Sequence, residues 1–180
     1  VEDVASVFQR KMMDWVDIRD FGAKGDGVTN DAAAFLAADG AALASGRTLL
    51  VSAGTYFVDA DITVAADARF EGRIVMPAAR RLSLTRNFNL PAYADAFGSE
   101  EEGFKKAFQA LLNFSDHESL DLGGRRIAVT APLNMQAIVG NKTIFATRRV
   151  IRNGQFDAIA GPAWTTATVT SQATYSAAAP

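Results

Sequence analysis

Hydrophobic residues follow helical spacing in two separate stretches of the chain. The first stretch has the spacing i, i+3, i+7 and i+8 and places Phe35, Ala38, Ala42 and Leu43 on one helical face. The second has the spacing i, i+4, i+7 and i+8, at Phe104, Phe108, Leu111 and Leu112. Gly46 is expected to end the first helix.

Short apolar runs punctuated by glycine follow each predicted helix, and their length predicts strands. After the first helix the predicted strands are Thr48–Val51, Thr55–Val58, Ile62–Val64 and Arg73–Met76. After the second helix they are Ser119–Leu122, Arg126–Val129 and Thr143–Ala146.

The two stretches repeat one order of elements at a constant offset of 70 positions. The matched pairs are Thr29 with Ser99, Leu50 with Leu120, Gly54 with Gly124, Phe57 with Ile127, and Ile74 with Ile144. Ser99 and Glu102 form a capping box, in which each side chain binds a backbone N–H at the helix start. Thr29 is expected to cap the first helix in the same way. We therefore predict two units, 16–96 and 97–161.

Strands this short cannot form a stable sheet with their immediate neighbours alone, so they predict a solenoid in which strands stack upon one another. The end of such a stack exposes unpaired backbone and apolar side chains, and an amphipathic helix can cover it. The predicted class is therefore mainly β with short α, a solenoid with capping helices. A β-sandwich is the alternative.

The run V-D-I-R-D-F-G-A-K-G-D-G-V-T-N-D from Val16 to Asp31, with G-R-T-L-L-V-S-A-G-T-Y-F-V from Gly46 to Val58, resembles the entry to the pectate-lyase-like right-handed parallel β-helix. That superfamily includes polygalacturonase-like hydrolases, pectate lyases and many phage tailspikes. Asn30 stands where the pattern has an aspartate, and Ser52 where it has a proline. The resemblance implies the start of a right-handed parallel β-helix, and it is specific for the fold and not for a reaction.

The segment 1–15 carries an apolar stripe at Val4, Phe8, Met12 and Trp15. In phage tailspikes a short helix of this kind joins the attachment region to the β-helix, so the resemblance implies an N-terminal helix that forms a homotrimer. Alternatively, the segment folds back onto its own domain. At the other end, 162–180 has no charged residue and is expected to be an extended tail or a truncated rung.

The composition argues against several kinds of partner and binding site. A formal net charge of −2 argues against nucleic acid as a partner. The chain has no cysteine and one histidine, so we expect no disulfide, no metal site and no bound cofactor. No apolar run is long enough to insert into a membrane.

Three groups of acidic residues are candidates for acid–base chemistry, because glycosidases use two carboxyl groups across the sugar bond. They are Asp20, Asp26 and Asp31; Asp59 and Asp61, expected on one face of a strand; and Asp116-His117-Glu118, the site of the only histidine. The alternative for each group is structural: a turn and a helix cap, a solvated face, and a helix end in solvent. The sequence assigns no catalytic residue.

Arginine pairs and two late aromatic residues are candidates for sugar contacts. Guanidinium groups bind acidic sugars with two hydrogen bonds, or else make ion pairs between subunits or face solvent; they are Arg80-Arg81, Arg125-Arg126, Arg148-Arg149 and Arg152. Trp164 and Tyr175 would stack on sugars or pack in an interface or interior.

The resemblance implies the N-terminal assembly part of a phage tailspike, located in the virion and acting outside the bacterial host. The full protein would contact other virion tail proteins and would bind and degrade a bacterial surface polysaccharide. The active groove would lie beyond these 180 residues, so we expect this part to be inactive alone. The alternatives are a self-sufficient polysaccharide lyase or glycoside hydrolase, and a non-catalytic carbohydrate-binding module.

Overall fold

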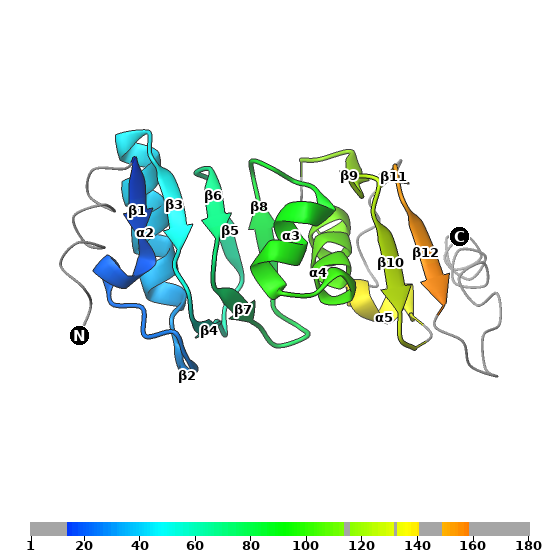
Figure 1. The fold of residues 1–180 in the computed structure, drawn as a ribbon, viewed down its shortest axis with the longest axis horizontal. Coiled ribbons are helices and arrows are strands. Elements are labelled where there is room, and N and C mark those ends of the chain that lie inside the picture. The colour runs from blue at the N-terminus through cyan, green and yellow to red at the C-terminus, as the bar shows by residue number, and fades with distance from the viewer. Residues whose placement is uncertain (1–13, 114–115, 132, 141–148, 159–180) are drawn as a thin grey trace.

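The computed structural model describes residues 14–113, 116–131, 133–140 and 149–158, arranged as an elongated row of short strands and helices (Figure 1). The helices are η1 (Ile18–Phe21, a 3-10 helix), α2 (Ala32–Ser45), α3 (Leu90–Phe97), α4 (Glu100–Leu112) and α5 (Met135–Val139). The first strands are β1 (Trp15–Asp17), β2 (Asp26–Asn30), β3 (Thr48–Val51), β4 (Thr55–Phe57), β5 (Ile62–Val64), β6 (Ala68–Phe70), β7 (Arg73–Val75) and β8 (Leu82–Leu84). The later strands are β9 (Ser119–Asp121), β10 (Arg126–Val129), β11 (Val150–Arg152) and β12 (Gln155–Ala158).

Within the described residues, every pairing between these strands is parallel. The strands before α3 form three sheets, with orders β1-β3-β6, β2-β4-β7 and β5-β8. Partners from β3 onward lie 18 to 20 residues apart: Leu49 with Ala68, Tyr56 with Ile74, and Ile62 with Leu82. After α4, β9 pairs with β11 and β10 with β12. The mainly β class with a few helices is confirmed, and parallel pairing argues against the alternative of an antiparallel sandwich.

The predicted strands that fall in the described residues agree with the structure to within one residue at each end. They are β3, β4, β5, β7, β9 and β10. The prediction missed β1, β2, β6, β8, β11 and β12. Trp15, expected to belong to the N-terminal helix, is instead the first residue of β1. The rest of that predicted helix and the predicted strand 143–146 lie outside the described residues.

Helix α2 begins differently from the prediction. Thr29 does not cap it, because Asp31 occupies the N-cap position. The Thr29 hydroxyl instead donates to Asp26 Oδ2 (2.7 Å), and Asn30 Oδ1 accepts from the backbone N–H of Ala32 (3.2 Å). The hydroxyl binds the carboxylate three residues before it, so the helix starts two residues later than the repeat suggests.

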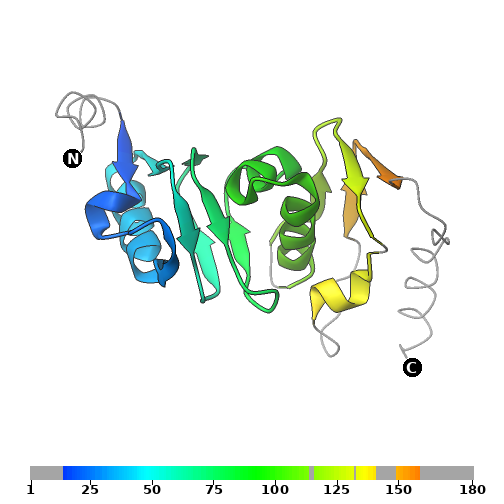
Figure 2. The ribbon, with the colours of Figure 1, turned by 60° about the horizontal axis from the view of Figure 1, so that its bottom comes forward.

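One face of α2 packs against the first strands of the chain. Phe35, Ala38 and Ala42 are buried, and the helix contacts β1, β3 and β5 (Figures 1 and 2). Asp39 is buried as well, and its carboxylate accepts hydrogen bonds from the backbone N–H groups of Ala65 and Ala66. Leu43, predicted to share the buried face, is 49% exposed. These contacts show that α2 packs on the first strands, and its role as the cap of a solenoid stays a prediction.

Helix α4 also agrees with the prediction, but its position does not. The Ser99 hydroxyl accepts from the backbone N–H of Glu102 (3.4 Å), which is one half of the predicted capping box. The Glu102 carboxylate accepts from Lys105 Nζ (2.7 Å). Rather than covering a free end, α4 packs between β8 on one side and β9 and β10 on the other (Figure 2). Helix α3, which the sequence analysis missed, packs along α4.

The two predicted units share a helix followed by two strands and then diverge. β3 and β4 of the first unit correspond to β9 and β10 of the second at the offset of 70. At the positions that would match β5, the second unit instead contains Leu133 and Asn134, directly followed by α5. The repeat therefore accounts for the start of each unit, and the domain boundaries at 16–96, 97–161 and 162–180 stay predictions.

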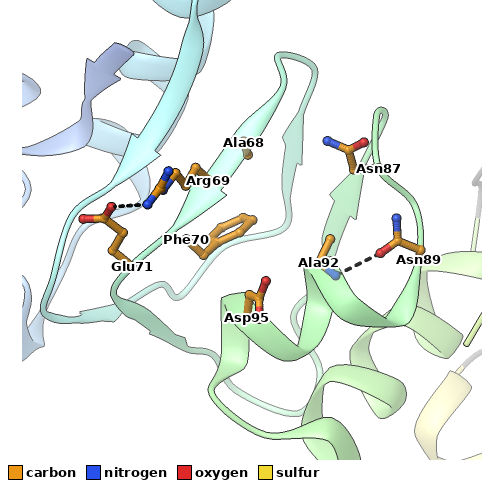
Figure 3. A pocket seen from close by; sticks show the side chains of 8 residues that line it. All are labelled: Ala68, Arg69, Phe70, Glu71, Asn87, Asn89, Ala92 and Asp95. Atoms are coloured by element: carbon orange, nitrogen blue, oxygen red, sulfur yellow. Dashed lines mark hydrogen bonds and ion pairs between the residues drawn. The ribbon is translucent and has the colours of Figure 1, made fainter. Parts of the chain in front are cut away.

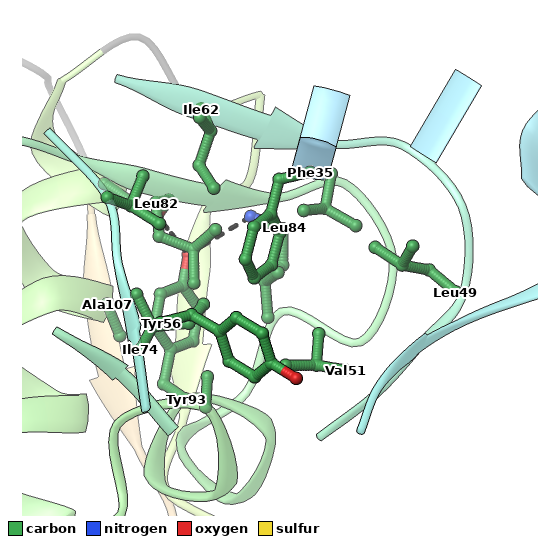
Figure 4. Packing of buried hydrophobic residues seen from close by; sticks show 14 of the residues in the cluster. Phe35, Leu49, Val51, Tyr56, Ile62, Ile74, Leu82, Leu84, Tyr93 and Ala107 are labelled. Carbon is green, nitrogen blue, oxygen red and sulfur yellow. Dashed lines mark hydrogen bonds between the residues drawn. The ribbon is translucent and has the colours of Figure 1, made fainter. Parts of the chain in front are cut away.

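The core is continuous from α2 through the strands to α3 and α4. Aromatic and aliphatic side chains from separate elements meet there, as Figure 4 shows for Phe35, Leu49, Val51, Tyr56, Ile62, Ile74, Leu82, Leu84, Tyr93 and Ala107. Phe35 meets Tyr56 edge to face, with ring centroids 6.0 Å apart. Such pairs stabilise a core beyond the area they bury.

The edge of β8 that has no partner strand is bound by a side chain of α3. The Tyr93 hydroxyl donates to the carbonyl oxygen of Leu82 (2.9 Å) and accepts from the backbone N–H of Leu84 (3.2 Å). Tyr93 is fully buried, and burial raises the pKa of its hydroxyl, which therefore stays protonated and able to donate. A strand edge left unpaired is costly in a buried position, so Tyr93 terminates this sheet.

We expect Tyr93→Phe to lower the free energy of unfolding by about 1 to 2 kcal/mol, because it leaves one buried donor and one buried acceptor without a partner. Chemical denaturation followed by circular dichroism measures the change. The ring stays in place, so a loss of this size reports the hydroxyl alone. A variant as stable as the parent chain would contradict the role assigned to Tyr93.

Candidate functional site

A shallow pocket lies between β6 and the start of α3 (Figure 3). Its volume is about 500 Å³, within the usual range for sites that bind small molecules. Its lining combines apolar and polar side chains: Ala68, Arg69, Phe70, Glu71, Asn87, Asn89, Ala92 and Asp95.

Two asparagines shape the wall formed by the loop before α3. Asn87 has a left-handed backbone (φ 54°), a conformation that asparagine tolerates better than most residues. Asn89 is the N-cap of α3, and its Oδ1 accepts from the backbone N–H of Ala92 (2.9 Å). The cap uses the oxygen of the Asn89 amide, so the Nδ2 group is left to donate elsewhere.

The charged groups of the pocket are not equivalent. Arg69 forms an ion pair with Glu71 (3.1 Å), and its guanidinium group also lies over the Trp15 ring, 4.9 Å from the centroid. Asp95 is exposed, and no other described residue forms a hydrogen bond or ion pair with its carboxylate. The lining thus carries one neutralised pair and one unpaired negative charge.

The groups that line the pocket suit non-covalent contacts with a polar ligand. It offers a carboxylate, a free amide N–H group and the half-buried Phe70 ring, and it contains no histidine, serine or lysine. Within the described residues, no group of three or more His, Asp or Glu side chains is placed to hold a metal ion.

The three acidic candidates near the opening motif lie in different elements: Asp20 in η1, Asp26 at the start of β2, and Asp31 at the N-cap of α2. Asp20 is exposed in η1. Asp31 is buried, and its carboxylate accepts from the backbone N–H groups of Lys24 (2.7 Å) and Gly25 (3.1 Å). Gly25 has φ of 64°, and a Cβ there would lie 2.9 Å from the Tyr56 ring. These contacts agree with the structural interpretation of the motif.

Asp26 holds a turn through backbone donors. Its carboxylate accepts from the N–H groups of Thr29 (2.8 Å) and Val28 (2.9 Å), as well as from the Thr29 hydroxyl. These hydrogen bonds favour the ionised form and lower the pKa of Asp26 from 3.8 to about 2.

We expect the Asp26 carboxyl to titrate with a midpoint near pH 2, because protonation breaks the hydrogen bonds of the turn. With the folded pKa below the unfolded one, its contribution to stability is complete above pH 3.8 and is lost as the pH falls towards 2. Carboxyl chemical shifts in an NMR titration measure the midpoint. Thr29→Ala, which removes one of the donors, should move it upward, and a midpoint of 3.8 or above in the parent chain would refute the assignment.

Asp59 and Asp61 are not on a strand, contrary to the prediction. They lie between β4 and β5, where Asp59 pairs with Arg80 (2.8 Å) and Asp61 with Arg81 (2.8 Å). The acidic loop thus binds the basic loop that stacks next to it, and the two candidate sets neutralise each other.

Two side chains of α4 hold the loop that carries these arginines. Lys106 Nζ donates to the carbonyl oxygens of Pro77 (2.7 Å) and Arg80 (2.6 Å), and Gln109 Nε2 donates to that of Ala78 (2.9 Å). Lys106 is buried, and desolvation lowers its pKa to about 8. Lys106 was not predicted to be buried, because it directly follows Lys105 and resembles a second solvated lysine of an amphipathic helix.

The other candidate arginines also bind groups of this chain. Arg125 pairs with Glu100 (3.0 Å), Arg126 with Asp157 (3.0 Å), Arg152 with Asp121 (3.2 Å), and Arg149 donates to the carbonyl oxygen of His117 (2.7 Å). Each described candidate arginine therefore has an acceptor within the chain. Arg148, Trp164 and Tyr175 lie outside the described residues.

His117 does not end a helix in solvent, contrary to the prediction. It is half-buried, its ring stacks on Phe88 with centroids 4.3 Å apart, and its Nε2 lies 3.1 Å from the carbonyl oxygen of Leu84. Asp116 and Glu118 on either side are exposed. The trio does not form an acid–base cluster, because the histidine points inward and its neighbours point outward.

A buried polar network that the sequence analysis missed joins η1 to the β3–β4 turn. Asp17 accepts from the Ser52 hydroxyl (2.9 Å), and the Tyr56 hydroxyl donates to the carbonyl oxygen of Ser52 (2.9 Å). Arg19 completes it by donating to the Tyr56 hydroxyl (3.0 Å) and to the carbonyl oxygen of Ala53 (2.8 Å). The sequence feature that could have indicated this network is Ser52, because the proline of the family pattern has no hydroxyl group to donate to Asp17.

Comparison with known proteins agrees with the resemblance over the first third of the chain. Residues 15–73 match the model of the family described as rhamnogalacturonase A/epimerase, pectate lyase-like. This range includes η1, α2 and β1 to β6. No curated protein matches the chain. No described helix has both the length and the apolar composition to cross a membrane.

A solved structure titled "Geobacillus virus E2 - ORF18" aligns with 27% sequence identity and a TM-score of 0.29. The alignment covers 49% of this chain and 20% of the viral protein. The chain therefore spans about a fifth of the length of that protein, and a structural similarity this low carries no argument about fold or function.

Proposed function

We propose that the chain is the N-terminal assembly part of a phage tailspike that binds and degrades a bacterial surface polysaccharide. The observation that carries the proposal is the coincidence of three features in one stretch. Residues 15–73 match a polysaccharide-active family, their strands pair in parallel at a short interval, and α2 covers the first of those strands.

The arrangement of the strands as a solenoid belongs to the same proposal. Partners from β3 onward lie 18 to 20 residues apart, the spacing of a chain that coils back over itself, so we take β1 to β8 as the first rungs of a right-handed parallel β-helix. The ion pairs of Asp59 with Arg80 and Asp61 with Arg81 join successive loops of this coil. The apolar stripe of residues 1–15 would then join three copies at a common axis.

The described residues favour a structural role over a catalytic one. Most of the acidic and basic candidates bind backbone groups or one another. The groove that cleaves polysaccharide would lie in residues beyond this chain. In this proposal the protein belongs to the virion tail, contacts other tail proteins, and acts at the outside of the host cell.

Size-exclusion chromatography with light scattering tests the assembly role. A homotrimer should have three times the monomer mass, and Val4→Asp with Phe8→Asp should reduce it to a monomer with an unchanged circular dichroism spectrum. Incubation with host capsule should release neither reducing ends nor unsaturated sugars. A monomeric parent chain would refute the assembly role, and released sugars would favour the alternative of a self-sufficient lyase or hydrolase.

A further inference from the structure

We propose that the pocket between β6 and α3 binds one uncharged, hydroxyl-rich sugar unit through Asp95, Asn89 and Phe70. The inference rests on the proposed polysaccharide function for its class of ligand. The residues of the pocket decide which kind of sugar it accepts.

The carboxylate of Asp95 is the first contact. It is exposed at the pocket and has no partner among the described residues, so it is free to accept hydrogen bonds from two neighbouring hydroxyl groups. Hydrogen bonds to a charged acceptor are stronger than those between neutral groups, and this makes Asp95 the main anchor.

The amide of Asn89 is the second contact. Its Oδ1 is occupied by the α3 cap, which fixes the amide plane and leaves the Nδ2 group as a donor. This group can donate to a second hydroxyl group of the sugar whose other hydroxyl groups bind Asp95. The helix cap thus also orients a binding group.

The half-buried ring of Phe70 supplies an apolar surface in the same pocket (Figure 3). A pyranose ring has one face of C–H groups, which pack on an aromatic ring while the hydroxyl groups point to the rim. The combination of one ring with polar groups around it favours a sugar over a purely apolar ligand.

Charge disfavours acidic sugars. Arg69 is paired with Glu71 at 3.1 Å, which offsets its charge, and Asp95 adds a negative charge that repels a uronate carboxylate. The pocket therefore differs from a site for acidic polysaccharide, for which free arginines would be needed.

Titration of the chain with single sugars, followed by NMR of its backbone and asparagine side-chain amides, tests the inference. A neutral probe from a panel of glucose, galactose, mannose, rhamnose and N-acetylglucosamine should shift the signals of Phe70, Asn89 and Asp95. Galacturonate at the same concentration should shift them less. If no neutral probe moves these signals, or if galacturonate binds more tightly than all of them, the proposal fails.

Variants of the anchor separate binding from folding. Asp95→Ala should weaken binding about tenfold or more, because it removes a charged acceptor. Asp95→Asn keeps one acceptor oxygen but loses the charge, so it should weaken binding less than Asp95→Ala does. Asp20→Ala, at an exposed carboxylate of η1, is the matched control and should leave the affinity unchanged. Equal affinity of Asp95→Ala and the parent chain would overturn the proposal.

This titration reads binding to the chain alone, so its outcome is independent of the assembly test. A monomeric chain that still binds a neutral sugar would refute the trimer and leave the pocket standing. A trimer whose pocket signals never move would do the reverse.

Discussion

Replacing Phe104 with alanine is expected to lower the free energy of unfolding by about 3 to 5 kcal/mol, as for other fully buried aromatic residues. Phe104 has no exposed surface, and its ring contacts those of Phe108 on α4 and Phe156 on β12, with centroids 5.8 and 4.8 Å away. The substitution would leave a cavity where α4 meets the C-terminal strands. Chemical denaturation of the variant measures the loss.

Phe21→Ala is the matched control for this prediction. Phe21 is 40% exposed at the end of η1, so the same change of side chain should cost much less there. Similar losses for the two variants would mean that Phe104 is not buried between α4 and β12.

Alanine at Gly103 is expected to destabilise the protein by about 1 to 3 kcal/mol, although alanine is the better helix former. Gly103 faces α3, and a Cβ there would lie 2.7 Å from the backbone nitrogen of Ala94 and 2.8 Å from the carbonyl carbon of Tyr93. Backbone atoms cannot rotate away as a side chain can, so α3 and α4 would have to separate. The melting temperature and the denaturation midpoint should both fall.

Gly40→Ala supplies the opposite expectation on a comparable helix. Gly40 is exposed in the interior of α2, and no atom lies within 4 Å of a Cβ built there. Alanine should stabilise the protein at this position by about 0.5 to 1 kcal/mol. If both variants shifted stability in the same direction, the close approach of α3 to α4 would be wrong.

Much of the fold could be predicted from the sequence because several strands lie next to strong turn signals. β3 and β4 are separated by Ser52, Ala53 and Gly54, and the apolar spacing of α2 and α4 is regular. The missed strands β6 and β8 contain no β-branched residue, whereas the predicted strands β5 and β7 of the same length do. A run such as Ala68–Phe70 gains its conformation from the hydrogen bonds of the sheet and not from its own composition.

The position of α3 and α4 could not be read from the sequence either. The apolar spacing of α4 indicates one buried face, yet buried residues lie on several sides of this helix, among them Phe104, Lys106 and Gln109. Lys106 and Gln109 are polar and look like surface positions. They are buried because they donate hydrogen bonds to carbonyl groups of the 77–80 loop. The sequence around α4 does not indicate that this loop packs against the helix.

The residues of the candidate site could not be predicted from the sequence either. Sequence patterns drew attention to pairs of like charges, such as Arg80-Arg81, and the structure pairs these with carboxylates. Asp95 and Asn89 carry no such pattern, since one is an isolated acid on a helix that was not predicted and the other is its cap. They come together with Phe70 only through the packing of α3 beside β6.

The layer formed by α3 and α4 divides the molecule into two regions that share almost no backbone hydrogen bonds. β1 to β8 pair only among themselves, as do β9 to β12, and a single bridge from Asn89 to Asp121 crosses between them within the described residues. Tension along the long axis would therefore be carried here by the covalent chain and by side-chain contacts, without a ladder of paired strands. A protein with such a joint could bend at this level while the parallel sheets on either side keep their shape.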